Sequence, residues 1–202
     1  SYFHFGLDTD TMGKRKIRSD FDPVLRAIRT GGSVLIYTTK ASIYDKTVFN
    51  KFKLYIDECR SLTDPQALQL IDQFKKCIGA NDKDEGYYAS SMLEYMRKGI
   101  VVHHGSLPLQ ARLILEHITQ HFTQSGFCRI CFATSTLEQG INMPFDVVYL
   151  NTFQASRTLS MKNLIGRAGR STTRSRFDYG SVVIKAENMS AFRAIMLNDE
   201  VL

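Results

Sequence analysis

The residues with the clearest chemical potential are two arginines in a short run that also contains two glycines, residues 163–170. Arg167 and Arg170 lie three positions apart, so on a helix they share one face. From Arg157 to Arg176 the chain carries six basic residues and no acidic one. Each glycine inside a helix costs about 1 kcal/mol relative to alanine, which favours a functional reason for having two. The run predicts a site for a large anion; a solvated basic helix end is the alternative.

Three other segments bring small hydroxyl residues or glycines to the ends of apolar runs. They are residues 38–40, 103–106 and 134–144. Backbone N–H groups at loop-to-helix junctions suit phosphate binding, because they present unpaired donors to an anion. For any one segment, simple helix capping by Ser or Thr is the alternative explanation. Three such segments in one chain favour phosphate recognition.

Short apolar runs alternate with segments of helical spacing along the chain. The runs predict buried strands at residues 33–37, 100–103, 128–133, 147–150 and 181–184. Helices are expected at 23–30, 41–57, 64–78, 87–98 and 108–126. This alternation is typical of an α/β fold with a parallel sheet covered by helices on both faces. Ligands of such sheets bind at the carboxyl ends of the strands, where the three segments would lie.

Length and composition indicate one domain. The chain has 202 residues, 44% of them hydrophobic, and a net charge of +6 that suits an anionic partner. We expect residues 1–20 to be a lead-in, residues 21–202 to form the domain, and residues 54–98 to be a helical insertion within it. No apolar run approaches the roughly 18 residues of a membrane span, so no membrane partner is expected. Four cysteines do not make a disulfide framework, which favours a reducing, cytoplasmic location.

Cysteine and histidine pairs offer weaker candidates. Cys128 and Cys131 have the spacing of a zinc or redox pair, but on a strand they would face opposite sides of the sheet. We therefore expect buried structural cysteines and no metal site. His103 and His104 would also face opposite ways, and we expect one of them to be a structural residue.

Taken together, these segments resemble the second, C-terminal RecA-like domain of superfamily 2 DEAD/DEAH-type helicases, above all the superkiller-type branch. Residues 34–40 resemble motif IV, residues 99–108 with Arg112 resemble the segment between motifs IV and V, residues 133–144 resemble motif V and residues 163–170 resemble motif VI. The resemblance spans roughly residues 32–186. It implies a RecA-like (P-loop NTPase-type) parallel sheet flanked by helices on both faces.

The resemblance also implies roles at an ATP site. Arg170 matches the arginine finger that stabilises charge on the γ-phosphate during phosphoryl transfer, and Arg167 matches its companion. Gly140 and Asn142 match motif V positions near the nucleotide ribose and the cleft between the domains. Many relatives have Asp in place of Asn142, and Gln or His in place of Asn163. The residues expected to contact ATP without catalysing its hydrolysis are Gly140, Asn142, Asn163 and Gly166.

A second set of positions would hold one strand of nucleic acid by its sugar-phosphate backbone. Such contacts explain binding that does not depend on base sequence. The partner would be single-stranded or unwinding DNA or RNA. The residues of this set are Thr39, Lys40, Gly105, Thr134 and Thr136.

The chain carries no Gly-x-x-x-x-Gly-Lys-Ser/Thr phosphate-binding loop. It therefore supplies half of an ATP site, and we expect ATP with Mg²⁺ to be held mainly by an N-terminal RecA-like domain in cis or by a separate subunit. This segment alone is expected to be monomeric and inactive. Two alternatives remain, namely a motor domain that moves a polypeptide and a non-catalytic nucleic-acid-binding module.

Overall fold

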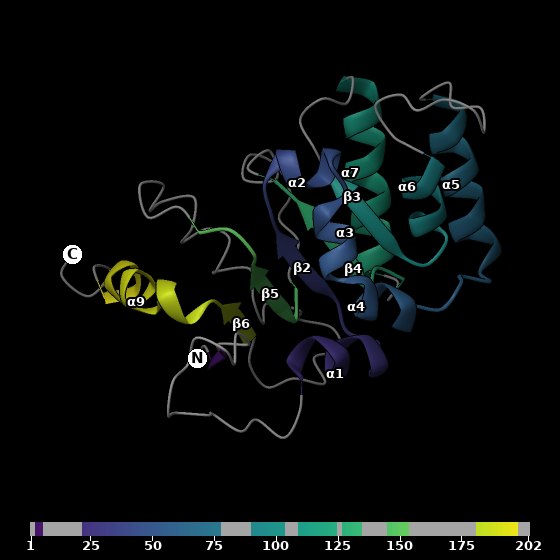
Figure 1. The fold of residues 1–202 in the computed structure, drawn as a ribbon. Coiled ribbons are helices and arrows are strands. Elements are labelled where there is room, and N and C mark those ends of the chain that lie inside the picture. The colour runs from purple at the N-terminus through teal and green to yellow at the C-terminus, as the bar shows by residue number, and fades with distance from the viewer. Residues whose placement is uncertain are drawn as a thin grey trace.

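The computed structural model describes residues 3–5, 22–77, 90–103, 109–124, 127–134, 145–153 and 181–197. Figure 1 shows these segments arranged around one twisted sheet. Its strands are β1 (Phe3–Phe5), β2 (Val34–Tyr37), β3 (Ile100–His103), β4 (Ile130–Ala133), β5 (Val147–Leu150) and β6 (Ser181–Ile184).

The sheet has six strands in the order β1-β6-β5-β2-β4-β3, and every pairing is parallel. Every residue of β2, β3, β4 and β5 is buried. Strands buried on both faces favour apolar side chains throughout, which is why they appear in the sequence as apolar runs; His103 at the end of β3 is the polar residue among them. The predicted α/β parallel architecture is therefore confirmed.

The central strands end level with one another. Tyr37, the last residue of β2, pairs with Ala133 of β4 and Leu150 of β5, and Ala133 also pairs with His103 of β3. Whatever follows each of these strands therefore begins at the same edge of the sheet.

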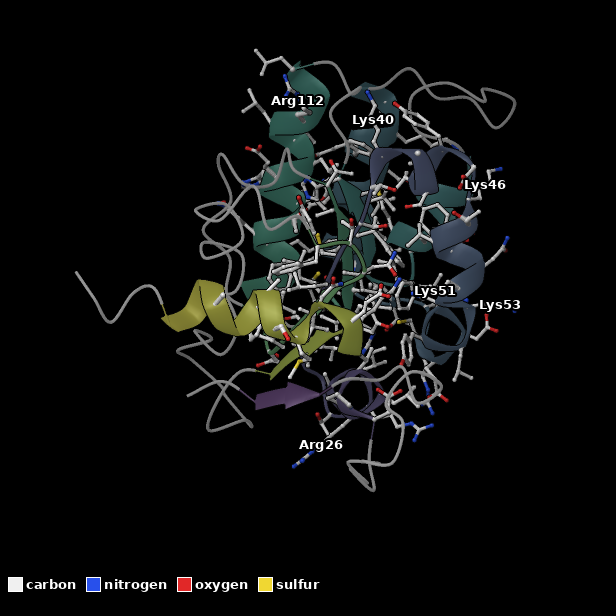
Figure 2. The ribbon with its side chains drawn as sticks, turned by 60° about the vertical axis from the view of Figure 1, so that its left-hand side comes forward. Arg26, Lys40, Lys46, Lys51, Lys53 and Arg112 are labelled. Carbon is white, nitrogen blue, oxygen red and sulfur yellow. The ribbon has the colours of Figure 1, made fainter. Side chains whose placement is uncertain are left out.

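The helices surround the sheet. They are α1 (Pro23–Arg29), α2 (Lys40–Tyr44), α3 (Thr47–Lys51), α4 (Lys53–Glu58), α5 (Pro65–Cys77), α6 (Ser90–Met96), α7 (Leu109–Gln124) and α9 (Met189–Leu197), with a 3-10 turn η3 at Ala186–Asn188. In Figure 2 the green helix α7 and the blue helices α3 and α4 lie on opposite sides of the strands.

Aromatic side chains join α3 and its flanking turn to the sheet. Phe49 packs edge-on to Phe132 of β4 with ring centroids 5.2 Å apart, and Phe52 packs edge-on to Tyr149 of β5 at 4.9 Å. Edge-to-face pairs of this kind contribute about 0.5–1.5 kcal/mol beyond the burial of their area. They fix the segment that directly follows β2 and α2 against the sheet.

Helices α5 and α6 lie within the segment expected to be a helical insertion. Helix α5 buries Ala67, Ile71 and Phe74, which share one helical face, and it packs against α7. Helix α6 packs against β3, the last strand of the sheet on that side. The segment thus widens the helical layer beside β3 (Figure 1).

The single helix expected at residues 41–57 is wrong, because three short helices occupy that segment. Asp45 breaks the first one: its Oδ1 accepts hydrogen bonds from the backbone N–H and the hydroxyl of Thr47, at 2.9 and 2.6 Å. Lys46 between them adopts the left-handed conformation, with φ 64°. Local side-chain bonds of this type compete with helix continuation.

Two smaller differences concern the strands. Residues 3–5, within the expected lead-in, form the edge strand β1 beside β6. The strand expected at 128–133 begins at Ile130, so Cys128 precedes it rather than lying on it. Cys59, Cys128 and Cys131 are nevertheless all buried thiols, as expected.

Candidate nucleic-acid interface at the carboxyl edge of the sheet

Three of the predicted site residues belong to the part of the chain that the structure describes: Thr39, Lys40 and Thr134. All three follow strands that end at the same edge of the sheet. The others lie outside the described residues, and their roles stay predictions: Gly105, Thr136, Gly140, Asn142, Asn163, Gly166, Arg167 and Arg170.

Thr39 is the N-cap of helix α2 and Lys40 its first residue; one residue, Thr38, separates them from β2, and both side chains are exposed. Thr39 caps the helix, its Oγ1 accepting a hydrogen bond from the backbone N–H of Ser42 at 3.2 Å. A threonine hydroxyl has one proton and two lone pairs, so this bond leaves the proton as a donor for an anionic oxygen. The ammonium of Lys40 lies 5.6 Å from the centre of the Tyr44 ring. This turn therefore presents a hydroxyl and a cation at the surface.

Thr134 lies at the end of β4 with only 4% of its surface exposed. The neighbouring backbone is tightly paired, because the N–H of Thr38 donates to the carbonyl of Ala133 at 2.8 Å. Thr134 could contact a nucleic-acid strand only if the atoms that cover Thr134 moved. The structure thus brings Thr39 and Thr134 to one edge, but only Thr39 lies on its surface.

A series of hydrogen bonds that the sequence did not reveal supports the turn at Thr39 and Lys40. Lys51 Nζ donates to Asn151 Oδ1 at 2.7 Å, and Asn151 Nδ2 donates to Thr38 Oγ1 at 3.1 Å. Thr38 Oγ1 and Ser42 Oγ are 2.7 Å apart, and Ser42 Oγ donates to the carbonyl of Thr39 at 2.8 Å. The series links α3 and the end of β5 to the first turn of α2. The position of Asn151 directly after a predicted strand was the one feature of the sequence that could have indicated this role.

Arg112 adds a second cation at this end of the molecule. It lies in the first turn of α7, and its Nε is buried without a hydrogen-bond partner in the described part of the chain. Figure 2 shows Lys40 and Arg112 towards the same end of the molecule, with Arg26 at the opposite end. Two elements therefore present positive charge at the carboxyl edge.

Groups with displaced pKa values lie elsewhere and have structural explanations. Burial raises the pKa of Asp146, which precedes β5 and accepts a hydrogen bond from the N–H of Ser33 at 2.8 Å. Burial also raises the pKa of Tyr55, whose hydroxyl donates to Asp22 at 2.6 Å. Because Asp22 also caps α1, that contact joins α1 to α4. These groups hold the fold together rather than form a site.

His103 has the structural role expected for one of the two histidines. It is buried, and its Nε2 lies 2.8 Å from Thr119 Oγ1, which donates its own proton to the carbonyl of Leu115 at 2.6 Å. Because the threonine proton is already used, His103 Nε2 must be the donor. This bond ties the end of β3 to α7.

Neither a metal cluster nor a membrane helix is present in the described segments. Nowhere among them do three His, Cys, Asp or Glu side chains gather as metal ligands. None of their helices is long and apolar enough to cross a membrane.

Sequence comparison identifies known proteins that are similar to this chain. No known family profile matches the chain. It is 29% identical over 140 residues to the antiviral helicase SKI2 of Saccharomyces cerevisiae, covering 66% of this chain and 10% of that protein. It is 27% identical over 139 residues to the DExH-box ATP-dependent RNA helicase DExH10 of Arabidopsis thaliana, covering 64% and 13%. It is 33% identical over 88 residues to Superkiller complex protein 2 of Mus musculus, covering 39% and 7%.

These similarities support a helicase-family domain of the superkiller type. The resemblance read from the motifs is thereby confirmed at the level of the helicase family. The chain spans only 7% to 13% of the length of these relatives. The carboxyl edge of the sheet carries Thr39 and Lys40 on its surface, and Arg112 lies in the first turn of α7.

Proposed function

We propose that this chain is the C-terminal motor domain of an ATP-dependent helicase or translocase that moves along a single strand of nucleic acid. The observation that carries the proposal is the level carboxyl edge of the sheet, where a hydroxyl and two cations from separate elements face the same end. The superkiller-like relatives support a helicase-family activity. A backbone grip of this kind suits movement that ignores base sequence.

The grip would come from Thr39 and Lys40 together with Gly105 and Thr136. Thr134, which is buried here, would join it when the atoms that cover it move. Hydroxyl and backbone N–H donors would bind phosphate oxygens, while Lys40 would contribute long-range attraction. RNA is the first polymer to test, because one relative is named an RNA helicase. DNA is the second.

The ATP-dependent part of the proposal rests on the motif VI arginines. Arg170 would act as the arginine finger and Arg167 as its companion, with Gly140, Asn142, Asn163 and Gly166 contacting the nucleotide. The chemistry of these groups is cationic or neutral, so they suit the phosphates and the ribose rather than Mg²⁺. We propose that Mg²⁺ and most of the ATP contacts belong to an N-terminal RecA-like domain of the same protein.

The test is ATP hydrolysis by the full-length protein with no polymer, single-stranded RNA or single-stranded DNA. Stimulation by either polymer is expected, with a binding affinity that falls steeply as salt rises. The absence of stimulation by both, with ATP still bound, would contradict the proposal and favour a polypeptide cargo or a non-catalytic module.

The arginine finger has its own test. Arg170→Ala should lower ATP turnover by about 10³-fold or more while ATP binding persists. Arg174→Ala, in the same basic run but outside the motif, is the matched control. Near-normal turnover in Arg170→Ala would remove the assignment.

A further inference from the structure

We propose that Asn151 is a positioning residue for the strand-contacting turn at Thr39 and Lys40, and that Lys51 sets its orientation. The inference rests on the proposed function, which makes that turn part of the strand grip. Asn151 lies outside all the motif segments of the helicase resemblance.

Asn151 is tied to the end of β2 by both its backbone and its side chain. Its backbone N–H donates to the carbonyl of Tyr37 at 3.0 Å, and its side-chain amide reaches the next residue, Thr38, at 3.1 Å. Thr38 is buried, with 2% of its surface exposed. The amide therefore contacts the residue that directly precedes the turn.

The donor and acceptor in each hydrogen bond of this series follow from the number of protons available. An ammonium only donates, so Lys51 fixes the oxygen of the Asn151 amide towards itself and the nitrogen towards Thr38. Ser42 uses its one hydroxyl proton on the carbonyl of Thr39. Thr38 must then donate to Ser42 and accept from Asn151.

This series of hydrogen bonds ends at Thr39, the residue proposed to contact the nucleic acid. Ser42 contacts Thr39 twice, because its hydroxyl donates to the Thr39 carbonyl and its N–H donates to Thr39 Oγ1. Without the Asn151 donor, Thr38 Oγ1 loses its partner on that side and its hydroxyl becomes able to rotate away from Ser42. The turn at Thr39 would then sample more orientations, and ordering it would weaken strand binding.

The experiment uses the full-length protein and titrates its ATPase activity with single-stranded RNA and single-stranded DNA. In Asn151→Leu, which keeps the size and the charge, the polymer concentration for half-maximal stimulation should rise about fivefold, the effect of one net hydrogen bond. The rate at saturating polymer should change by less than about twofold, since the reacting groups are untouched. The salt dependence of the affinity should not change, because no phosphate contact is removed.

Lys51→Met provides a second variant, should Asn151→Leu fail to fold. Its matched control is Lys53→Met: Lys53 is also exposed and also contacts one side-chain oxygen, that of Asp57, at 2.6 Å. Lys51→Met should raise the half-saturating concentration and Lys53→Met should leave it near the original value. Adding Thr38→Val to Asn151→Leu should cost no more than the larger single change, because both remove the same bond.

Two results would overturn the inference. In one, Asn151→Leu and Lys51→Met both match Lys53→Met in half-saturating concentration. In the other, Asn151→Leu lowers the saturated rate while the half-saturating concentration stays constant. If the unmodified protein responds to neither polymer, the proposed function itself fails and the positioning role fails with it.

Discussion

Gly99 offers a sharp test of how β3 and β4 are joined. It lies in the turn between α6 and β3 with φ +75°, in the left-handed region that favours glycine. A β-carbon at this position would overlap the carbonyl oxygen of Phe127 and lie 3.3 Å from its carbonyl carbon. The carbonyl of Gly99 also accepts a hydrogen bond at 2.9 Å from the backbone N–H of Arg129, the residue that precedes β4.

Gly99→Ala should therefore destabilise the fold through two separate costs. The left-handed conformation costs a residue with a β-carbon about 1–2 kcal/mol. The overlap is with backbone, which cannot rotate away, so a further cost of about 1–3 kcal/mol for overpacking applies. We expect a loss of about 3 kcal/mol in the free energy of unfolding, because moving Phe127 also weakens the Arg129 bond.

Gly31→Ala is the matched control. Gly31 has φ +81°, and its β-carbon would have no atom within 4 Å. This variant should show the conformational cost alone, about 1 kcal/mol. Urea unfolding of both variants at neutral pH measures the difference. If Gly99→Ala loses no more stability than Gly31→Ala, the close approach of Phe127 is not a constraint and the reasoning is refuted.

Two further predictions concern buried titratable groups. Burial raises the pKa of Asp146, so the native state binds a proton there more tightly than the unfolded state does. The stabilisation from this proton is full below the unfolded pKa of about 3.9 and is lost as pH rises through the native pKa. Asp146→Asn should match the original protein near pH 3 and gain relative stability towards pH 7; urea unfolding at both pH values checks this, and a constant difference would contradict it. Burial also raises the pKa of Cys59 to about 11, and its thiol contacts the carbonyl of Tyr55 at 3.4 Å. Iodoacetamide should therefore modify Cys59 far more slowly in the native protein than in urea, which peptide mass mapping measures; equal rates would contradict its burial.

Most of the sheet was predictable because its chemistry is local. A strand buried on both faces needs consecutive apolar residues, and the runs that contain β2, β3, β4, β5 and β6 have them. β1 was not predicted, since three residues in a polar segment carry no pattern of their own. Its existence depends on pairing with β6, far along the chain.

The candidate site divides in the same way. Thr39 and Lys40 were placed from sequence because they belong to the segment that follows a strand, and strand ends define where ligands bind in parallel sheets. The bonds from Lys51 to Asn151 and from Asn151 to Thr38 were not predicted. They join residues about a hundred positions apart, and only the adjacency of β2 and β5 brings them together. The break at Asp45 was missed because a side-chain bond to Thr47 outweighed the helical spacing of the surrounding apolar residues.

The strand order also governs when this domain can fold during synthesis. β2 pairs with β4 and β5, β3 pairs with β4, and β1 pairs with β6. Among the described strands, none can therefore find a neighbour until Ile130–Ala133 has left the ribosome. Until then β2 and β3, which are apolar at nearly every position, have no sheet to enter. A nascent chain that has exposed fewer than 130 residues outside the ribosome should depend on chaperones that bind apolar segments. One that has exposed residues up to 150 should begin to protect β2 from proteolysis.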